Sequence, residues 1–252
     1  MKRYIMLRAV ISFVLMSPFL LADTITIAVA ANVSYAMEEL KTEFSRSNPD
    51  TKVVVILGSS GKLTAQIRNG APYGLLMSAD MRYPQDLFDD KIAVSKPLVY
   101  AKGSLAYFSV NKRDFSGGIG VLTDEKIYKI AIANPKTAPY GKASLEAMKT
   151  AKVYEQLKTK LVFAESVSQT LAYAMTATDI GLVAKSSLYS AKMSQYKENV
   201  HWSSVDESLY QPIEQGVVLL KYADKSSTYQ LFYDFILSPK AKAIFKKYGY
   251  VQ

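Results

Sequence analysis

The chain has 252 residues, of which 49% are hydrophobic and 21% are charged, and its formal net charge is +9. This composition is typical of a globular protein and excludes a disordered or fibrous chain. The sequence contains no cysteine, which excludes disulfides, thiolate metal sites, cysteine nucleophiles and a lipid-modified N-terminal cysteine.

The first 22 residues have the pattern of a secretory signal peptide. Lys2, Arg3 and Arg8 make a basic start, residues 9–21 are almost wholly apolar, and Ala22 offers a small residue for cleavage. The alternative is an uncleaved anchor, although the apolar run is short for a membrane span. Cleavage would leave 230 residues (252 − 22) with a net charge of +6 (9 − 3). Because no lipid anchor is available, we expect a Gram-negative periplasm, where an outer membrane retains the protein.

Strands and helices alternate in the first part of the mature chain. Residues 24–30, 52–57 and 75–78 are short apolar or β-branched runs typical of buried strands. Apolar residues at helical spacing follow the first two runs, and Asn32 is predicted as the N-cap of the first helix. The order strand, helix, strand, helix, strand predicts a parallel sheet covered by helices.

A second block has the same character. Its predicted strands cover residues 105–110, 129–133, 160–163 and 180–183, and helices follow the second and third of them. A last strand, residues 216–220, precedes two helices separated at Pro239. We therefore predict two α/β lobes with a ligand cleft between them. Lobe 1 would comprise residues 23–102 and 214–252, and lobe 2 residues 103–213.

Four predicted strand-to-helix junctions could together surround an anion. They are residues 30–32, 58–61, 138–141 and 164–167. Each places unpaired backbone N–H groups at the positive end of a helix, and Asn32 and Ser60 add side-chain donors. Neutral donors replace the lost hydration of a buried oxyanion without the desolvation that a buried lysine requires. Each junction alone fits a plain helix cap or turn equally well.

The sequence carries no signature of catalysis or of nucleotide binding. The segment GSSGK, residues 58–62, has two residues between its glycines where a phosphate-binding loop needs four, and Leu63 stands where that loop needs Ser or Thr. The single histidine, His201, cannot build a metal cluster, and no G-x-S-x-G motif occurs. We expect no enzymatic activity, no cofactor and no nucleic-acid partner.

Five segments resemble the periplasmic molybdate-binding proteins of the ModA type. They are residues 27–37 (IAVAANVSYAM), 57–67 (LGSSGKLTAQI), 69–80 (NGAPYGLLMSAD), 134–141 (NPKTAPYG) and 163–171 (FAESVSQTL). Their order and spacing, rather than any single motif, carry the resemblance. It implies a type II periplasmic-binding-protein fold, with two Rossmann-like α/β lobes joined by two crossover strands. It also implies a monomeric binding protein that delivers molybdate or tungstate to an ABC-transporter permease at the inner membrane.

The resemblance also implies the ligand residues. Asn32 matches the ligand residue of the first loop and Ser60 the serine of the second, while Tyr140 and Val167 match residues that donate backbone N–H groups. These contacts would go to the oxyanion oxygens, so that no residue coordinates the metal atom directly. Four neighbours would support the site: Ala31, Ser59, Gly61 and Ser166.

Three positions depart from the family pattern. Ala31 stands where some members have a hydroxyl, which would remove one donor. Ala184 lies in a segment where some members use a tyrosine hydroxyl, and Gly74 stands where the family usually has an acidic residue. The loops alone leave sulfate, phosphate or another small oxyanion as an alternative ligand. A secreted enzyme on the same fold is the alternative of a different class.

Overall fold

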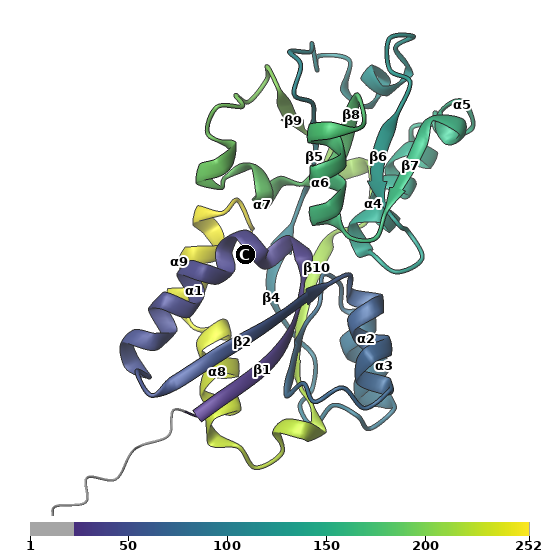
Figure 1. Cartoon of the computed structure of the whole chain (residues 1–252). Helices are drawn as coiled ribbons and strands as arrows, with labels where there is room; N and C mark the ends of the chain where they lie inside the picture. The colour runs from purple at the N-terminus through teal and green to yellow at the C-terminus, as the bar shows by residue number, and fades with distance from the viewer. Residues whose placement is uncertain (1–22, 252) are drawn as a thin grey trace, which may run out of the picture.

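The computed structural model describes residues 23–251. The predicted signal peptide, residues 1–22, lies outside the described residues. Within residues 23–251, no helix combines the length and the apolar character that a membrane span requires. The described chain forms two α/β bodies, one above the other in Figure 1, each built on a five-stranded sheet.

The lower sheet in Figure 1 has the strand order β2-β1-β3-β10-β4. Its strands are β1 (Asp23–Ala30), β2 (Thr51–Gly58), β3 (Leu75–Met77), β4 (Leu98–Gly103) and β10 (Ile213–Leu219). β1 runs parallel to β2 and β3, whereas β10 runs antiparallel to β3 and β4. The parallel arrangement predicted for β1, β2 and β3 is confirmed, and the antiparallel pairing of β10 makes the whole sheet mixed.

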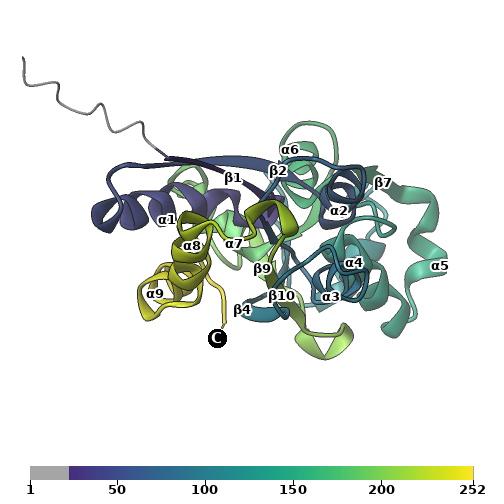
Figure 2. The ribbon, with the colours of Figure 1, turned by 90° about the horizontal axis from the view of Figure 1, so that it is seen from below.

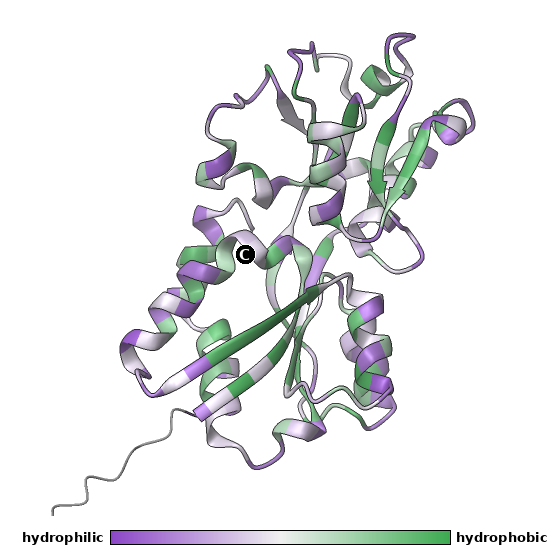
Figure 3. Cartoon of the chain, in the orientation of Figure 1, coloured by the Kyte–Doolittle hydropathy of each residue, from purple (hydrophilic) through white to green (hydrophobic). Residues whose placement is uncertain are grey.

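Alternating side chains of β1 divide the core of this lobe into two layers. Ile27 and Val29 face one side of the sheet, while Ala28 faces the other. The first side is covered by α1 (Ser34–Ser47), α8 (Ser227–Leu237) and α9 (Pro239–Lys247), and the second by α2 (Ser60–Arg68) and α3 (Arg82–Asp89). Figure 2 shows these two groups of helices on opposite sides of the strands. In Figure 3 hydrophobic residues follow β2, whereas α1 carries hydrophilic residues between its buried positions.

The upper sheet repeats the plan with the order β7-β6-β8-β5-β9. Its strands are β5 (Leu105–Phe108), β6 (Ile130–Ala133), β7 (Leu161–Ala164), β8 (Ile180–Ala184) and β9 (Trp202–Ser204). Its helices are α4 (Pro139–Thr150), α5 (Tyr154–Leu157), α6 (Val167–Thr176) and α7 (Lys185–Leu188). Short 3-10 helices complete the chain: η1 (Ala31–Val33), η2 (Gly118–Thr123), η3 (Lys158–Lys160), η4 (Ala191–Met193), η5 (Glu207–Leu209) and η6 (Lys221–Ala223).

The chain passes between the two sheets twice, at adjacent places. Ser104 alone separates β4 from β5, and β10 begins directly after Pro212. The two crossings lie side by side, because Ile213 pairs with Gly103 in the antiparallel ladder. A Cβ on Gly103 would lie 2.1 Å from Oη of Tyr140, so the crossing requires a glycine. The predicted fold class, two α/β lobes of the type II periplasmic-binding kind, is confirmed, while the predicted lobe boundaries stay a prediction.

Candidate ligand-binding site

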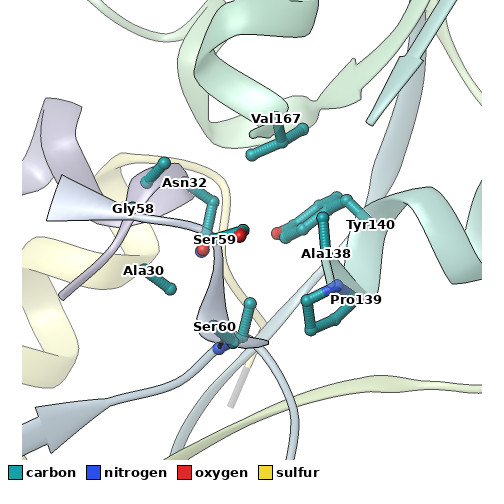
Figure 4. A pocket seen from close by; sticks show the side chains of 11 residues that line it. Ala30, Asn32, Gly58, Ser59, Ser60, Ala138, Pro139, Tyr140 and Val167 are labelled. Carbon is teal, nitrogen blue, oxygen red and sulfur yellow. Dashed lines mark hydrogen bonds between the residues drawn. The ribbon is translucent and has the colours of Figure 1, made fainter. Parts of the chain in front are cut away.

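A small cavity lies between the lobes, at the carboxyl ends of β1 and β2 and the starts of three helices. It has room for about one water-sized molecule. Its lining residues are Ala30, Ala31, Asn32, Gly58, Ser59, Ser60, Ala79, Ala138, Pro139, Tyr140 and Val167. All of these side chains are uncharged. Figure 4 shows them converging from both lobes, with Asn32, Ser59 and Ser60 from one and Tyr140 and Val167 from the other.

Three helices begin at the cavity wall. α2 begins at Ser60, α4 at Pro139 and α6 at Val167, and all three of these residues line the cavity. The first N–H groups of an α-helix have no acceptor within the helix and carry its positive partial charge. The cavity is therefore suited to an anion that accepts hydrogen bonds from backbone N–H groups.

The two serines at the start of α2 differ in their partners. Oγ of Ser60 accepts a hydrogen bond from the backbone N–H of Ala79 (2.9 Å), so its own hydrogen can be donated elsewhere. Ser59 occupies the N-cap position of α2, but its side chain makes no cap hydrogen bond. Oγ of Ser59 is buried and has no partner. An N-cap serine ordinarily bonds the helix, so the free hydroxyl of Ser59 marks this position as available to a ligand.

Asn32 is 1% exposed and takes part in a buried network. Its Nδ2 donates to Oε1 of Gln215 (2.8 Å) and to Oη of Tyr250 (2.9 Å), whereas its Oδ1 is buried without a partner. The prediction of Asn32 as the N-cap of α1 is wrong: Asn32 lies in η1, and Val33 holds the N-cap position. Its Nδ2 is bound by the long-range partners Gln215 and Tyr250, and Oδ1, the atom that would cap a helix, accepts no hydrogen bond.

Three tyrosine hydroxyls surround Gln215 and Asn32. Tyr100 donates to Oε1 of Gln215 (3.2 Å), Tyr140 accepts from its Nε2 (3.4 Å), and Tyr250 donates to the carbonyl oxygen of Asn32 (2.9 Å). Burial raises the pKa of Tyr250 to about 12 and raises the pKa values of Tyr100 and Tyr140 well above their ordinary value. All three hydroxyls therefore stay protonated and neutral near pH 7.

Hydrogen bonds join the lobes around the cavity. Oγ of Ser168 donates to the carbonyl of Ala31 (2.8 Å), and Oγ of Ser186 donates to that of Asn32 (3.1 Å). Lys62 and Glu165 form an ion pair across the outer edge of the cleft. Each of these contacts joins a residue of one lobe to a residue of the other, so the structure is that of a closed form.

Two of the predicted supporting residues do not line the cavity. The N–H of Gly61 donates to the carbonyl of Thr137 (2.9 Å) across the lobes, and a Cβ at Gly61 would lie 3.0 Å from that residue's backbone. Ser166 caps α6 by accepting from the N–H of Gln169 (3.3 Å). The other six predicted residues line the cavity, namely Asn32, Ser60, Tyr140, Val167, Ala31 and Ser59. Their roles toward a ligand stay a prediction.

The departures from the family pattern lie away from the cavity wall, apart from Ala31. A Cβ on Gly74 would lie 2.2 Å from the ring of Tyr229, so a larger residue has no room there. Ala184 is buried in the core of the upper lobe.

His201 accepts a hydrogen bond from the N–H of Lys197 (3.0 Å) and contacts the Tyr196 ring edge to face, which is a packing role.

Sequence reasoning missed Gln215, Tyr250 and Ala79. Gln215 precedes the predicted strand 216–220 by one residue, and β10 in fact begins at Ile213. A polar side chain within such an apolar strand, IEQGVVL, is the signal that could have identified Gln215. Tyr250 near the C-terminus carries no local signal, because its partner Asn32 is 218 residues away.

Comparison with known proteins identifies the class of this protein. The chain belongs to the bacterial extracellular solute-binding proteins, because the model of that family matches residues 25–251. Its relatives include the molybdate-binding protein ModA of Rhodobacter capsulatus, which is 35% identical over 232 residues covering 91% of this chain and 89% of the relative. ModA of Azotobacter vinelandii is 32% identical over 231 residues, 91% of this chain and 90% of the relative. The resemblance to ModA-type proteins predicted from five segments is confirmed.

Solved structures agree with this assignment. The periplasmic molybdate-binding protein of Azotobacter vinelandii matches with a TM-score of 0.83 and 31% identity, covering 90% of this chain and 99% of that one. The sulfate-binding protein SubI of Mycobacterium tuberculosis matches with a TM-score of 0.73 but only 12% identity, covering 90% of this chain and 86% of that one. This second match shows a shared fold alone.

Proposed function

We propose that this protein is the periplasmic binding component of an ABC importer and that it holds molybdate or tungstate in the cavity between its lobes. The proposed ligand residues are Asn32, Ser60, Tyr140 and Val167, to which we add the side chain of Ser59. Their contacts go to the oxygens of the anion, so the protein needs no metal-coordinating side chain and no cofactor.

One observation carries this proposal. Two side chains in one small cavity, Asn32 and Ser59, each have a buried polar atom without a partner. Such atoms cost about 1–3 kcal/mol each when they stay unsatisfied, so their concentration in one place indicates a missing polar ligand. The lining is uncharged and three helices begin there, so the positive ends of their dipoles favour an anion over a cation. Asn32 can contact that anion once its Nδ2 takes the place of Oδ1.

Molybdate, tungstate and sulfate are tetrahedral dianions of the same charge, so we propose that cavity size selects among them. The backbone donors lie on both lobes, and the closing contacts of Ser168 and Gly61 fix the distance between the lobes. A smaller anion such as sulfate would leave some of these donors unpaired, and unpaired buried donors lower its affinity. The names of the ModA relatives support the choice of molybdate.

Titration of the purified mature protein with molybdate, tungstate, sulfate and phosphate tests the proposal. Calorimetry should show binding of molybdate and tungstate, and at 100 times Kd the ligand should stabilise the fold by about 2.7 kcal/mol. Binding of sulfate or phosphate alone would keep the transport role and overturn the ligand. No binding of any of the four anions would overturn the site itself.

Delivery to a permease at the inner membrane, a monomeric state and cleavage of the signal peptide after Ala22 complete the proposal. With the lobe boundaries predicted above, the paired strands β4 and β10 would act as the hinge for opening and closing. Mass spectrometry of the protein from the periplasmic fraction would give the cleavage site, and size-exclusion chromatography would give the oligomeric state.

A further inference from the structure

The orientation of the Asn32 amide is unfavourable for an anion. Its acceptor, Oδ1, is the atom without a partner, while the two hydrogen bonds of Nδ2 go to Gln215 and Tyr250. An oxyanion placed in the cavity would meet the negative end of this amide. For Asn32 to serve as a donor, the amide must turn by half a rotation about its last side-chain bond.

A turned Asn32 amide requires a matching turn of Gln215. Oδ1 of Asn32 would then face Gln215, whose Oε1 would repel it unless Nε2 took its place. With both amides turned, Nε2 of Gln215 donates to Oδ1 of Asn32 and to Oη of Tyr100. Oε1 of Gln215 then accepts from the hydroxyl of Tyr140. The distances of the existing pairs, 2.8, 3.2 and 3.4 Å, serve both arrangements, because each turn only exchanges an amide nitrogen and oxygen.

The remaining groups of the network also stay satisfied. The hydroxyl of Tyr250 lies 2.9 Å from the carbonyl oxygen of Asn32 and 2.9 Å from its amide group. It can turn its hydrogen toward Oδ1, because Oγ of Ser186 donates to the same carbonyl (3.1 Å). The hydroxyl of Tyr100 can donate to the carbonyl of Ser78 (3.3 Å) in either arrangement. The one change at the cavity is that an acceptor is replaced by N–H donors.

We propose that Gln215 is a positioning residue that sets the orientation of the Asn32 amide, and that oxyanion binding turns the two amides together. This inference rests on the proposed function. Without ligand, the observed arrangement, in which Nδ2 of Asn32 bonds Gln215, leaves the acceptor Oδ1 unpaired. The turned arrangement would instead leave the N–H donors of Nδ2 unpaired. A bound oxyanion accepts from those donors and so favours the turned arrangement.

The network also connects the turn to lobe closure. Gln215 lies on β10 at the crossing between the lobes, and Tyr140 reaches it from α4 of the other lobe. The hydroxyl of Tyr140 is the group that donates to Gln215 in the turned arrangement, and this contact spans the two lobes of the closed form. Gln215 therefore couples the ligand contact of Asn32 to the closed form.

The variant Gln215→Met tests this role. Gln215 is fully buried, and methionine has a similar shape without hydrogen-bonding groups. Molybdate Kd measured by calorimetry should rise about ten- to hundredfold, because the turned Asn32 amide loses one of the two partners of its Oδ1 and keeps only Tyr250. Gln66→Met is the matched control: Gln66 accepts from the hydroxyl of Tyr73 (3.3 Å) in the same lobe and does not line the cavity. Its Kd should stay within about twofold of that of the unchanged protein.

A direct readout is the orientation of the amide in protein labelled with nitrogen-15. Nuclear Overhauser contacts of the Asn32 amide protons should be strong to the Tyr250 ring without ligand and should shift to the Val167 side chain with molybdate. This readout reports positioning independently of any loss of stability.

Two outcomes would overturn the inference alone: unchanged contacts of the Asn32 amide protons in the unchanged protein that binds molybdate, or wild-type affinity in a folded Gln215→Met variant. If the unchanged protein binds neither molybdate nor tungstate, the proposed function fails, and the inference fails with it.

Discussion

The substitution Ser59→Ala separates binding from stability most sharply. A serine at an N-cap ordinarily stabilises a protein, and its replacement by alanine costs about 0.5–2 kcal/mol. In this protein the Ser59 hydroxyl makes no cap bond, and its Oγ is buried without a partner. The backbone bond from the N–H of Leu63 to the carbonyl of Ser59 (3.0 Å) is kept by alanine.

The expected effects on stability and on binding have opposite signs. Removing an unsatisfied buried hydroxyl should leave the free energy of unfolding of the ligand-free protein unchanged or raise it by about 1 kcal/mol. Removing a donor to a charged ligand should weaken molybdate binding by about 1.5–3 kcal/mol, which is about 10- to 150-fold in Kd.

Urea unfolding without ligand and calorimetric titration with molybdate measure the two quantities on the same preparation. A destabilised variant with wild-type affinity would show that Ser59 caps α2 and does not contact the ligand. That result would refute the reasoning that unpartnered cavity atoms mark the ligand contacts.

Three further predictions follow from the same contacts. Ser60→Ala should lower the free energy of unfolding by about 1–3 kcal/mol, because the N–H of Ala79 loses its acceptor. The same variant should lower molybdate affinity by at least tenfold. An unchanged urea unfolding curve would contradict the predicted loss of stability. Lys62→Ala should raise the molybdate Kd by about fivefold at most, because both partners of the Lys62–Glu165 pair are about half exposed; a much larger rise in calorimetry would show that this pair controls closure. Tyr250 should leave the free energy of unfolding independent of pH below about pH 10, the ordinary tyrosine pKa. Above that pH the free energy of unfolding should fall as pH rises toward the folded pKa of about 12, because the folded state holds the proton more tightly than the unfolded state. Urea unfolding at several alkaline pH values, with Tyr250→Phe as control, measures this slope.

The sequence by itself determined the local elements and the loops that meet at the cavity. Eight of the ten strands within residues 23–251 correspond to predicted apolar runs, because buried strands carry short apolar or β-branched segments. β9 is only three residues long, and β4 begins with exposed Leu98 and Val99, so neither has a strong pattern. The four junctions could be predicted because a strand gives way to a helix at each of them. The resemblance to ModA-type proteins then singled out Asn32, Ser60, Tyr140 and Val167 within these junctions.

Only the tertiary structure decided how these loops are completed. The amide of Asn32 bonds Gln215 and Tyr250, which are 183 and 218 residues away, and no local pattern encodes such pairs. Gly61 serves lobe closure rather than the cavity wall, since its N–H meets Thr137 of the other lobe. Ser59 has the sequence of an ordinary helix cap, and only its burial beside an unsatisfied Asn32 distinguishes it from one. Local propensity chooses helices and turns, whereas the hydrogen-bond partners of a buried polar atom depend on which distant segments pack around it.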